Sequence, residues 1–156
     1  MENLRYRLFF RLHRLWFYFR RPVTLGVRAL VTDDQERILL VKHTYKPGWH
    51  MPGGGVNKGE TVFDSMKREL EEETGVVCRG EAKMIPAVYY NTNDFKHDHV
   101  LVFVVREWES NPGLKVAGEI CDQGFFPLRD LPEGTTPGTR RRVADFLSKS
   151  EQLFKW

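Results

Sequence analysis

Between residues 23 and 128 the apolar residues come in short runs separated by polar turn residues, a pattern that predicts β-strands. Val23 to Thr32 and Arg37 to His43 flank a polar turn and predict a β-hairpin. The run VLVFVV at 100–105 is apolar throughout, so we expect a strand buried on both faces. Further strands are predicted at 76–78, 83–90 and 125–128, and the segment 114–124 is expected to be irregular.

Helical patterns occupy other parts of the chain. Residues 61–74 contain neither Gly nor Pro and are followed by Gly75, so we expect a helix that ends in a glycine cap. Thr139 is expected to cap a last helix that runs to about residue 149. Helical spacing of three and four residues separates Leu4, Leu8, Leu12, Leu15 and Phe19. The chain is therefore predicted to be an α/β protein with one domain at 22–156 and a basic amphipathic helix at 1–21.

The N-terminal segment concentrates positive charge. Residues 1–21 contain six arginines and one glutamate, a charge of +5, so with a net charge of +3 the other 135 residues carry −2. Three interpretations remain for this segment: a helix packed on the domain or across a homodimer interface, a helix lying on an anionic membrane surface, or a cleaved transit peptide. Its arginines interrupt any signal-peptide core, which argues against secretion.

Composition limits the class of protein. A chain of 156 residues with 41% hydrophobic and 29% charged residues can form one globular domain with a substantial core. No apolar run is long enough to cross a bilayer. Cys78 and Cys121 form neither a metal-binding spacing nor a disulfide framework, so a reducing cytoplasm is expected. The alternative is a location at the membrane surface, with residues 1–21 making peripheral contact with the membrane.

Three carboxylates share one face of the helix predicted at 61–74. Glu69, Glu72 and Glu73 stand at positions i, i+3 and i+4, where like charges repel by a few tenths of a kcal/mol per pair. A solvated acidic face is one interpretation. The other is a site for a hard divalent cation, Mg²⁺ or Mn²⁺, which prefers carboxylate oxygens. Glycines at 53–55 precede the helix and would let the backbone approach a phosphate closely, which favours the second interpretation.

The stretch from Gly54 to Val76 carries a longer motif. Gly54, five residues, Glu60, seven residues and then the sequence RELEEETGV at 68–76 resemble the Nudix box at every defined position. The resemblance implies an α/β/α sandwich with a mixed β-sheet. It also implies an enzyme that uses Mg²⁺ or Mn²⁺ to hydrolyse a nucleoside diphosphate linked to another moiety, X.

The resemblance also assigns roles inside the box. Glu69, Glu72 and Glu73 are similar to the metal ligands of the family, and Glu60 to an additional metal or water-shell carboxylate. Arg68 is expected to brace the box by pairing with Glu60. Leu70 and Val76 are expected to face the core. Gly54 and Gly55 would bring the backbone to the substrate phosphates.

Candidates outside the box rest on weaker signals. A basic residue near Lys42 or His43 often meets the substrate phosphates in this family, although a solvated strand end is the alternative. His97 is a candidate substrate contact. Glu119, on the segment before the strand predicted at 125–128, resembles the glutamate that serves as general base in several members; Glu72 and Glu60 are the alternatives. Trp49 is expected to anchor the core or a loop.

The identity of X cannot be read from the sequence, and a small nucleotide-type substrate is expected rather than a nucleic acid. Nudix domains also serve as ligand sensors, usually with eroded boxes, whereas the box in this chain is complete. The basic segment adds another alternative, a membrane-associated hydrolase of a lipid-linked nucleotide.

Overall fold

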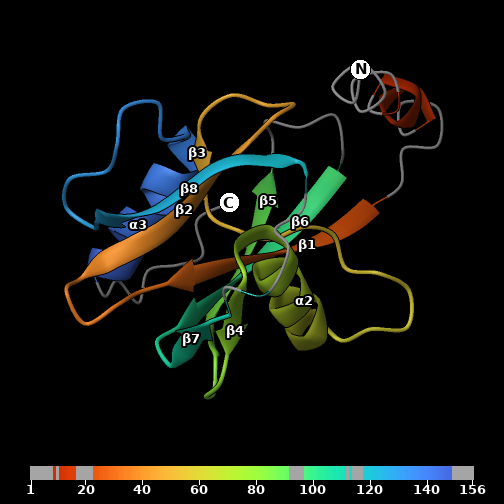
Figure 1. Ribbon diagram of the computed structural model, residues 1–156. Coiled ribbons are helices and arrows are strands. Elements are labelled where there is room, and N and C mark those ends of the chain that lie inside the picture. The colour runs from red at the N-terminus through yellow and green to blue at the C-terminus, as the bar shows by residue number, and fades with distance from the viewer. Residues whose placement is uncertain are drawn as a thin grey trace.

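The structure is a computed structural model that describes residues 9, 11–16, 23–91, 97–111, 113 and 118–148. Its elements follow in order: β1 (Val23–Val31), β2 (Arg37–His43), β3 (Trp49–His50), α2 (Val62–Thr74), β4 (Val76–Cys78), β5 (Lys83–Asn91), β6 (His97–Val105), β7 (Trp108–Ser110), β8 (Ile120–Pro127) and α3 (Pro137–Ser148) (Figure 1). Of the helix expected at residues 1–21, Phe9 and residues 11–16 are helical, and the others lie outside the described residues. No helix in the described part of the chain combines the length and the apolar character that a transmembrane span requires.

The strands form separate sheets. β6 lies in the centre of a mixed sheet, parallel to β1 and antiparallel to β5. β2 lies in the centre of an antiparallel sheet between β3 and β8, and β4 pairs with β7. The expected hairpin is therefore wrong, because β1 and β2 are joined by a single bridge between Thr32 and Ile38. Residues 38–41 are all buried, which suits a central strand with its own partners rather than the edge of a hairpin.

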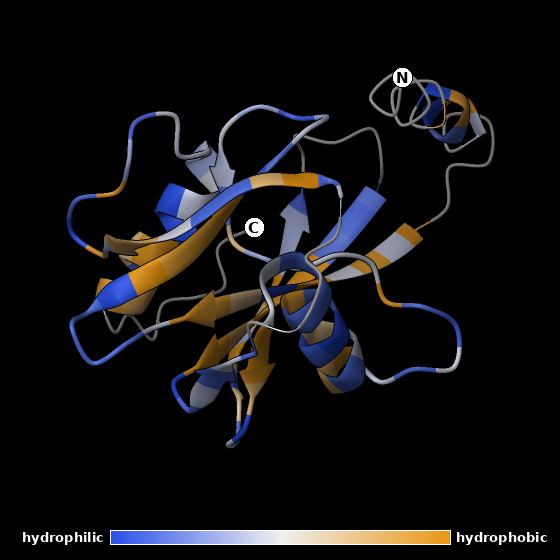
Figure 2. Ribbon diagram, in the orientation of Figure 1, coloured by the Kyte–Doolittle hydropathy of each residue, from blue (hydrophilic) through white to orange (hydrophobic). Residues whose placement is uncertain are grey.

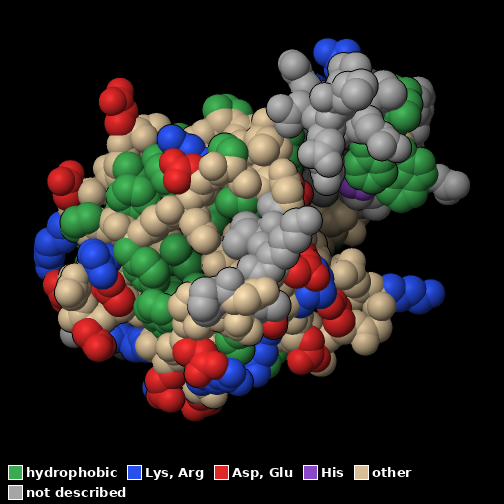
Figure 3. Space-filling model, in the orientation of Figure 1, with side chains coloured by type: hydrophobic (Ala, Val, Ile, Leu, Met, Phe, Trp, Pro, Cys, Tyr) green, Lys and Arg blue, Asp and Glu red, His purple; other side chains and the backbone are tan. Residues whose placement is uncertain are grey.

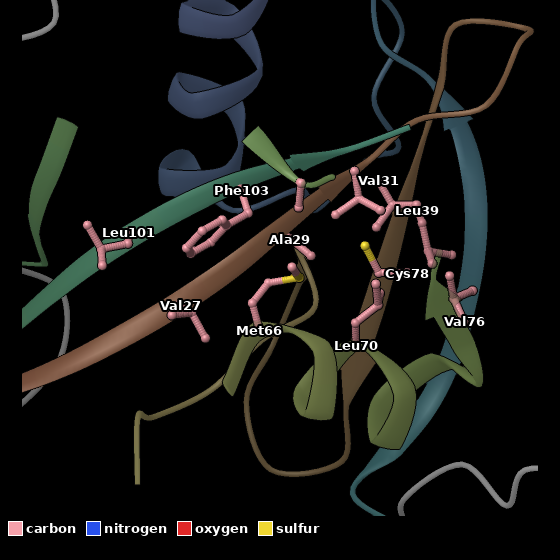
Figure 4. Packing of buried hydrophobic residues seen from close by; sticks show 12 residues of the cluster. Val27, Ala29, Val31, Leu39, Met66, Leu70, Val76, Cys78, Leu101 and Phe103 are labelled. Atoms are coloured by element: carbon pink, nitrogen blue, oxygen red, sulfur yellow. The ribbon is translucent and has the colours of Figure 1, made fainter. Parts of the chain in front are cut away.

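Two hydrophobic clusters lie on opposite faces of the strands. In the first, Met66 and Leu70 of α2 pack against Val27 and Ala29 of β1 and against Phe103 of β6 (Figure 4). The second contains Leu30, Ile38, Leu40, Val102 and Val143, so it joins both larger sheets to α3. Figure 2 shows the apolar colouring of these strands and of one side of α2. The expected α/β/α arrangement is confirmed, with α2 on one side of the strands and α3 on the other.

The ends of the helices follow local chemistry. Thr61 caps α2 by accepting a hydrogen bond from the Asp64 N–H, and Gly75 ends it in the left-handed region at φ 70°, as expected. α3 begins earlier than predicted, at Pro137, and Thr136 rather than Thr139 accepts the hydrogen bond of the cap. β8 likewise begins at Ile120, five residues before the predicted start at Phe125, because it pairs along the whole length of β2.

Candidate metal and active site

The glycine-rich loop before α2 is bound along β1. The Val27 N–H donates to the Gly54 carbonyl at 2.9 Å, and the Val56 N–H donates to the Leu25 carbonyl at 2.9 Å. Gly53 has φ 138°, and a Cβ atom there would lie 2.2 Å from the Val27 carbonyl oxygen. Only glycine fits this close approach. The mixed sheet, through β1, therefore fixes the glycine-rich loop over the second half of α2.

Gly54 makes room for the first of the box glutamates. A Cβ atom on Gly54 would lie 2.5 Å from the carboxylate carbon of Glu69, whereas a Cβ atom on Gly55 would meet nothing within 4 Å. The sequence suggested that both glycines bring the backbone to a phosphate. The structure gives Gly54 a further reason, which is that the Glu69 carboxylate occupies the space of the missing side chain.

Glu73 is the most deeply buried of the box carboxylates. It is 2% exposed and its Oε2 accepts a hydrogen bond from the Gly53 N–H at 2.8 Å. Burial, helped by the charges of Glu69 and Glu119, raises the pKa of Glu73 to about 7 against the opposing effects of Arg28 and the Gly53 N–H. A carboxylate held here is costly without a nearby cation.

His43 lies behind Glu73 rather than at an accessible strand end. Its Nε2 is 3.8 Å from Glu73 Oε1, too far for a hydrogen bond, and neither ring nitrogen has a partner within the described residues. Burial lowers the pKa of His43 to about 2, so the imidazole is neutral. Lys42 follows the opposite alternation of the strand, and its Nζ lies 4.4 Å from the ring centroid of Trp49. Trp49 is buried, as expected for a core anchor.

Arg68 links the box carboxylates to one another. Its guanidinium pairs with Glu60 at 2.7 Å, with Glu69 at 2.7 Å and with Glu72 at 3.3 Å. The predicted pairing with Glu60 is confirmed. Hydrogen bonds from Arg68 and from the Asn57 N–H lower the pKa of Glu60 to about 2, so Glu60 stays ionised. Leu70 and Val76 are buried, again as expected.

Glu119 reaches the same group of acids from another element. It lies directly before β8, and its carbonyl accepts a hydrogen bond from the Thr44 N–H at 2.8 Å, which attaches it to the end of β2. Burial raises the pKa of Glu119, and the charge of Glu69 adds to this effect. His97 is exposed at the start of β6 and contacts Tyr90, with 2.9 Å between its Nδ1 and the tyrosine hydroxyl.

The acids suit a hard divalent cation by their chemistry. Glu60, Glu69, Glu72, Glu73 and Glu119 provide oxygen donors, which Mg²⁺ and Mn²⁺ prefer. As they stand, no three His, Cys, Asp or Glu side chains of the described residues are arranged to hold one ion together. The guanidinium of Arg68 lies among three of the acids, and Glu73 is turned to Gly53. The donor types therefore fit the cation, and the raised pKa of the buried Glu73 carboxyl marks where positive charge is needed.

Sequence reasoning did not identify Arg28 as a site residue. Arg28 interrupts the apolar strand β1, and its Nη1 donates hydrogen bonds to the carbonyls of Met51, at 3.3 Å, and of Gly53. Its charge lowers the pKa of Glu73 against the effect of burial. The sequence did contain a signal for Arg28, because it is a charged residue inside the apolar run at 27–31.

A hollow of about 440 Å³ lies next to this group, on the side of the mixed sheet that faces α3. The two larger sheets and the start of α3 contribute its lining: Arg28, Lys46, Pro47, His50, Met51, Tyr89, Tyr90, Asn91, Val100, Val102, Thr136, Pro137, Gly138, Thr139, Arg141 and Arg142. Tyr89 and Arg142 stack within it, with 3.6 Å between the guanidinium carbon and the ring centroid. Of the substrate-contact residues predicted from the sequence, none lines this hollow.

Comparison with known proteins gives consistent matches. The profile of the NUDIX domain matches residues 22–146. The putative 8-oxo-dGTP diphosphatase of Bacillus subtilis (strain 168) is 29% identical over 131 residues, which cover 83% of this chain and 84% of that protein. The ADP-ribose pyrophosphatase of Methanocaldococcus jannaschii is 30% identical over 106 residues, which cover 66% of this chain and 62% of that protein.

A solved structure agrees with the sequence matches. The MutT NUDIX hydrolase from Burkholderia pseudomallei superposes with a TM-score of 0.68 at 28% identity, over 79% of this chain and 97% of that one. The relatives are named for different nucleotides, so the substrate of this chain has to be sought in its own side chains.

Proposed function

The chain is a member of the Nudix hydrolase family, and from this membership we propose that it is a Mg²⁺- or Mn²⁺-dependent pyrophosphohydrolase of a nucleoside diphosphate linked to another moiety, X. The observation that carries the proposal is the gathering of acids around the glycine-rich loop. Gly54 leaves space for Glu69, the Gly53 N–H binds Glu73, and Glu119 adds its charge from the residue directly before β8.

The proposed roles follow from position and charge. Glu69, Glu72 and Glu73 would hold the cation, with Glu60 as a further carboxylate. A divalent cation in this place neutralises charge on the pyrophosphate and makes a nearby water more acidic. Arg68 acts as a positioning residue, because its three ion pairs fix the directions of Glu60, Glu69 and Glu72.

Glu119 is the proposed general base. It takes a proton from the attacking water while the water oxygen forms a new bond to one phosphorus atom. The bond between that phosphorus and the bridging oxygen breaks, which gives a nucleoside monophosphate and a phosphorylated X, or pyrophosphate from a triphosphate. Burial and the charge of Glu69 raise the proton affinity of Glu119, which supports this role; Glu72 and Glu60 remain the alternatives.

A substrate panel tests the proposal. Nucleoside triphosphates including 8-oxo-dGTP, nucleotide sugars, ADP-ribose and dinucleoside polyphosphates are incubated with the protein and Mg²⁺ or Mn²⁺. We expect turnover of at least one compound, lost on chelation and lost in Glu72→Gln. Glu71→Gln is the matched control, because Glu71 occupies the unspecified position of the box. Tight binding of one compound without any turnover would support the ligand-sensor alternative instead.

A second candidate is a hydrolase at a membrane surface, acting on a lipid-linked nucleotide. The observation that favours it is the exposure of large apolar side chains beside arginines in the N-terminal segment (Figure 3). Phe9, Leu12, Leu15 and Trp16 are between 67% and 53% exposed, and Arg11 and Arg14 lie among them. Such a pattern suits an anionic bilayer surface.

A further inference from the structure

The hollow beside α3 adjoins the carboxylate site, and Arg28 belongs to both. Its side chain lines the hollow, while its Nη1 binds the carbonyls of Met51 and Gly53 at the start of the glycine-rich loop. Met51 also lines the hollow. A substrate whose pyrophosphate lies against the loop can therefore extend one end into the hollow. The nature of that end is a question that rests on the proposed function, the hydrolysis of a pyrophosphate.

Positive charge dominates the lining. Arg28, Lys46, Arg141 and Arg142 contribute to it, and none of its described residues is an aspartate or a glutamate. Composition does not account for this, because residues 22–156 carry a net charge of −2. A hollow lined by one sign of charge attracts a ligand of the opposite sign.

The arginines differ in how they are held. Arg142 is fixed by an ion pair to Asp145 at 2.8 Å and by its stacking on Tyr89. Arg141 is exposed, and no hydrogen bond or ion pair engages it within the described residues. Arg141 is therefore the cation that can turn to a ligand without losing a partner in the described part of the chain.

Hydrogen-bond donors lie beside these cations. α3 begins at Pro137, which has no N–H. Thr136 accepts hydrogen bonds from the N–H groups of Thr139 and Arg140. The Gly138 N–H is thus the first-turn donor for which the described residues offer no partner, and this helix end favours a negative charge. The hydroxyl of Tyr89 is buried and has no partner among the described residues. An anion in the hollow would meet the Gly138 N–H, since the space beside Gly138 is open, whereas the buried Tyr89 hydroxyl is not exposed to it.

We propose that the end of the substrate that enters this hollow carries an anionic phosphate of its own, separate from the pyrophosphate that is cleaved. The phosphate is a monoester, and it belongs either to the nucleoside or to the moiety X. The guanidinium of Arg141 and the Gly138 N–H at the start of α3 bind it. A substrate without this group loses these contacts.

Three compounds on one scaffold test the inference by binding, measured by calorimetry with Ca²⁺ in place of Mg²⁺ to suppress turnover. ADP-ribose is compared with ADP-ribose 2′-phosphate, which carries the extra phosphate on the nucleoside, and with ADP-ribose 1″-phosphate, which carries it on X. We expect one phosphorylated compound to bind about tenfold more tightly than ADP-ribose or better. Which of the two binds more tightly identifies the end of the substrate that occupies the hollow.

Arg141→Gln is expected to remove this preference while the affinity for ADP-ribose stays unchanged. Arg129→Gln is the control, since Arg129 is also exposed and the same charge is lost outside the lining. The inference is overturned if neither phosphorylated compound binds more tightly than ADP-ribose, or if Arg141→Gln keeps the preference. Hydrolysis without the preference contradicts only this inference, whereas the preference without any hydrolysis contradicts the proposed function.

Discussion

Two acids of the site, Glu60 and Glu119, have pKa values that are shifted in opposite directions. Arg68 keeps Glu60 ionised, because its hydrogen bonds and that of the Asn57 N–H lower the pKa of Glu60 to about 2. Glu119 experiences burial and the charge of Glu69, and both raise its pKa. One acid of the group is thus held as a carboxylate, while another has the raised proton affinity that a general base requires.

Replacing the proposed base tests this division of roles. Glu119→Gln should lower kcat by about 10²- to 10⁴-fold, the range typical of general bases, with little change in KM. The acid limb of the pH–rate profile should also change, since the wild type loses activity as the pH falls through the raised pKa of Glu119. Steady-state kinetics between pH 5 and about 9 measures both effects. A variant with near-normal kcat would move the base role to Glu72 or Glu60.

His50 gives a separate prediction for stability. Burial, with Lys46 and Arg28 nearby, lowers the pKa of His50 from 6.5 to about 4, so between these values the unfolded chain binds a proton that the folded chain does not. Stability from this residue is present above pH 6.5 and is lost as the pH falls to about 4. His50→Gln should therefore gain in Tm relative to the wild type as the medium is acidified. Thermal denaturation at several pH values checks this, and a Tm difference independent of pH would contradict it.

At the scale of elements, the ends of one helix could be predicted from local sequence signals, whereas strand pairing could not. The bounds of α2 could be predicted because Thr61 and Gly75 act on their own neighbours in the chain. The pairing of β2 with β8 rather than with β1 could not be predicted, because it depends on residues far away in sequence. The same holds for Arg28, whose contact with the Gly53 carbonyl exists only once the loop lies along β1. Local periodicity does not determine which distant segments of the chain pair with one another.

The loop and α2 together explain why one glycine of the box matters more than its neighbour. In Gly54→Ala the new Cβ would lie 2.5 Å from the Glu69 carboxylate, so Glu69 must move away from its position between the loop and Arg68. We expect the Mg²⁺ concentration at half-maximal activity to rise about 10- to 100-fold. Gly55→Ala is the matched control, since its Cβ meets open space. Equal metal dependence of the two variants would contradict the assignment of Glu69.

At the scale of the whole molecule, the placement of the box residues on one helix could be predicted, whereas their surroundings could not; the metal-binding roles of these residues stay predictions. Motif spacing identified Glu69, Glu72 and Glu73 because one helix carries all of them. The hollow was not predicted, since Arg28, Tyr89 and Arg141 come from β1, β5 and α3 and meet only in the folded chain. The prediction that Lys42 or His43 meets phosphates is untested, but the surroundings of both side chains could not be predicted either. Burial and strand alternation place the first on Trp49 and the second behind Glu73.

The N-terminal segment gives a prediction for the entire chain. The full-length protein should co-sediment with vesicles that contain anionic phosphatidylserine and much less with neutral vesicles, because apolar and cationic side chains are exposed together. The double substitution Leu12→Ser, Trp16→Ser should abolish the difference without affecting turnover of a soluble substrate. Equal sedimentation of wild type and variant would exclude the membrane interpretation. If the wild type has twice the mass of one chain in solution and the variant has the mass of a single chain, the segment forms a homodimer interface instead.

The hydrogen bond from the Gly53 amide to Glu73 has a practical use. That amide proton is hydrogen-bonded to Oε2 of the carboxylate that is proposed to coordinate the ion. Its nuclear magnetic resonance signal should therefore shift during a magnesium titration even before any substrate is added. Isotope labelling of glycine would thus turn the backbone of the loop into a built-in spectroscopic reporter of cation arrival.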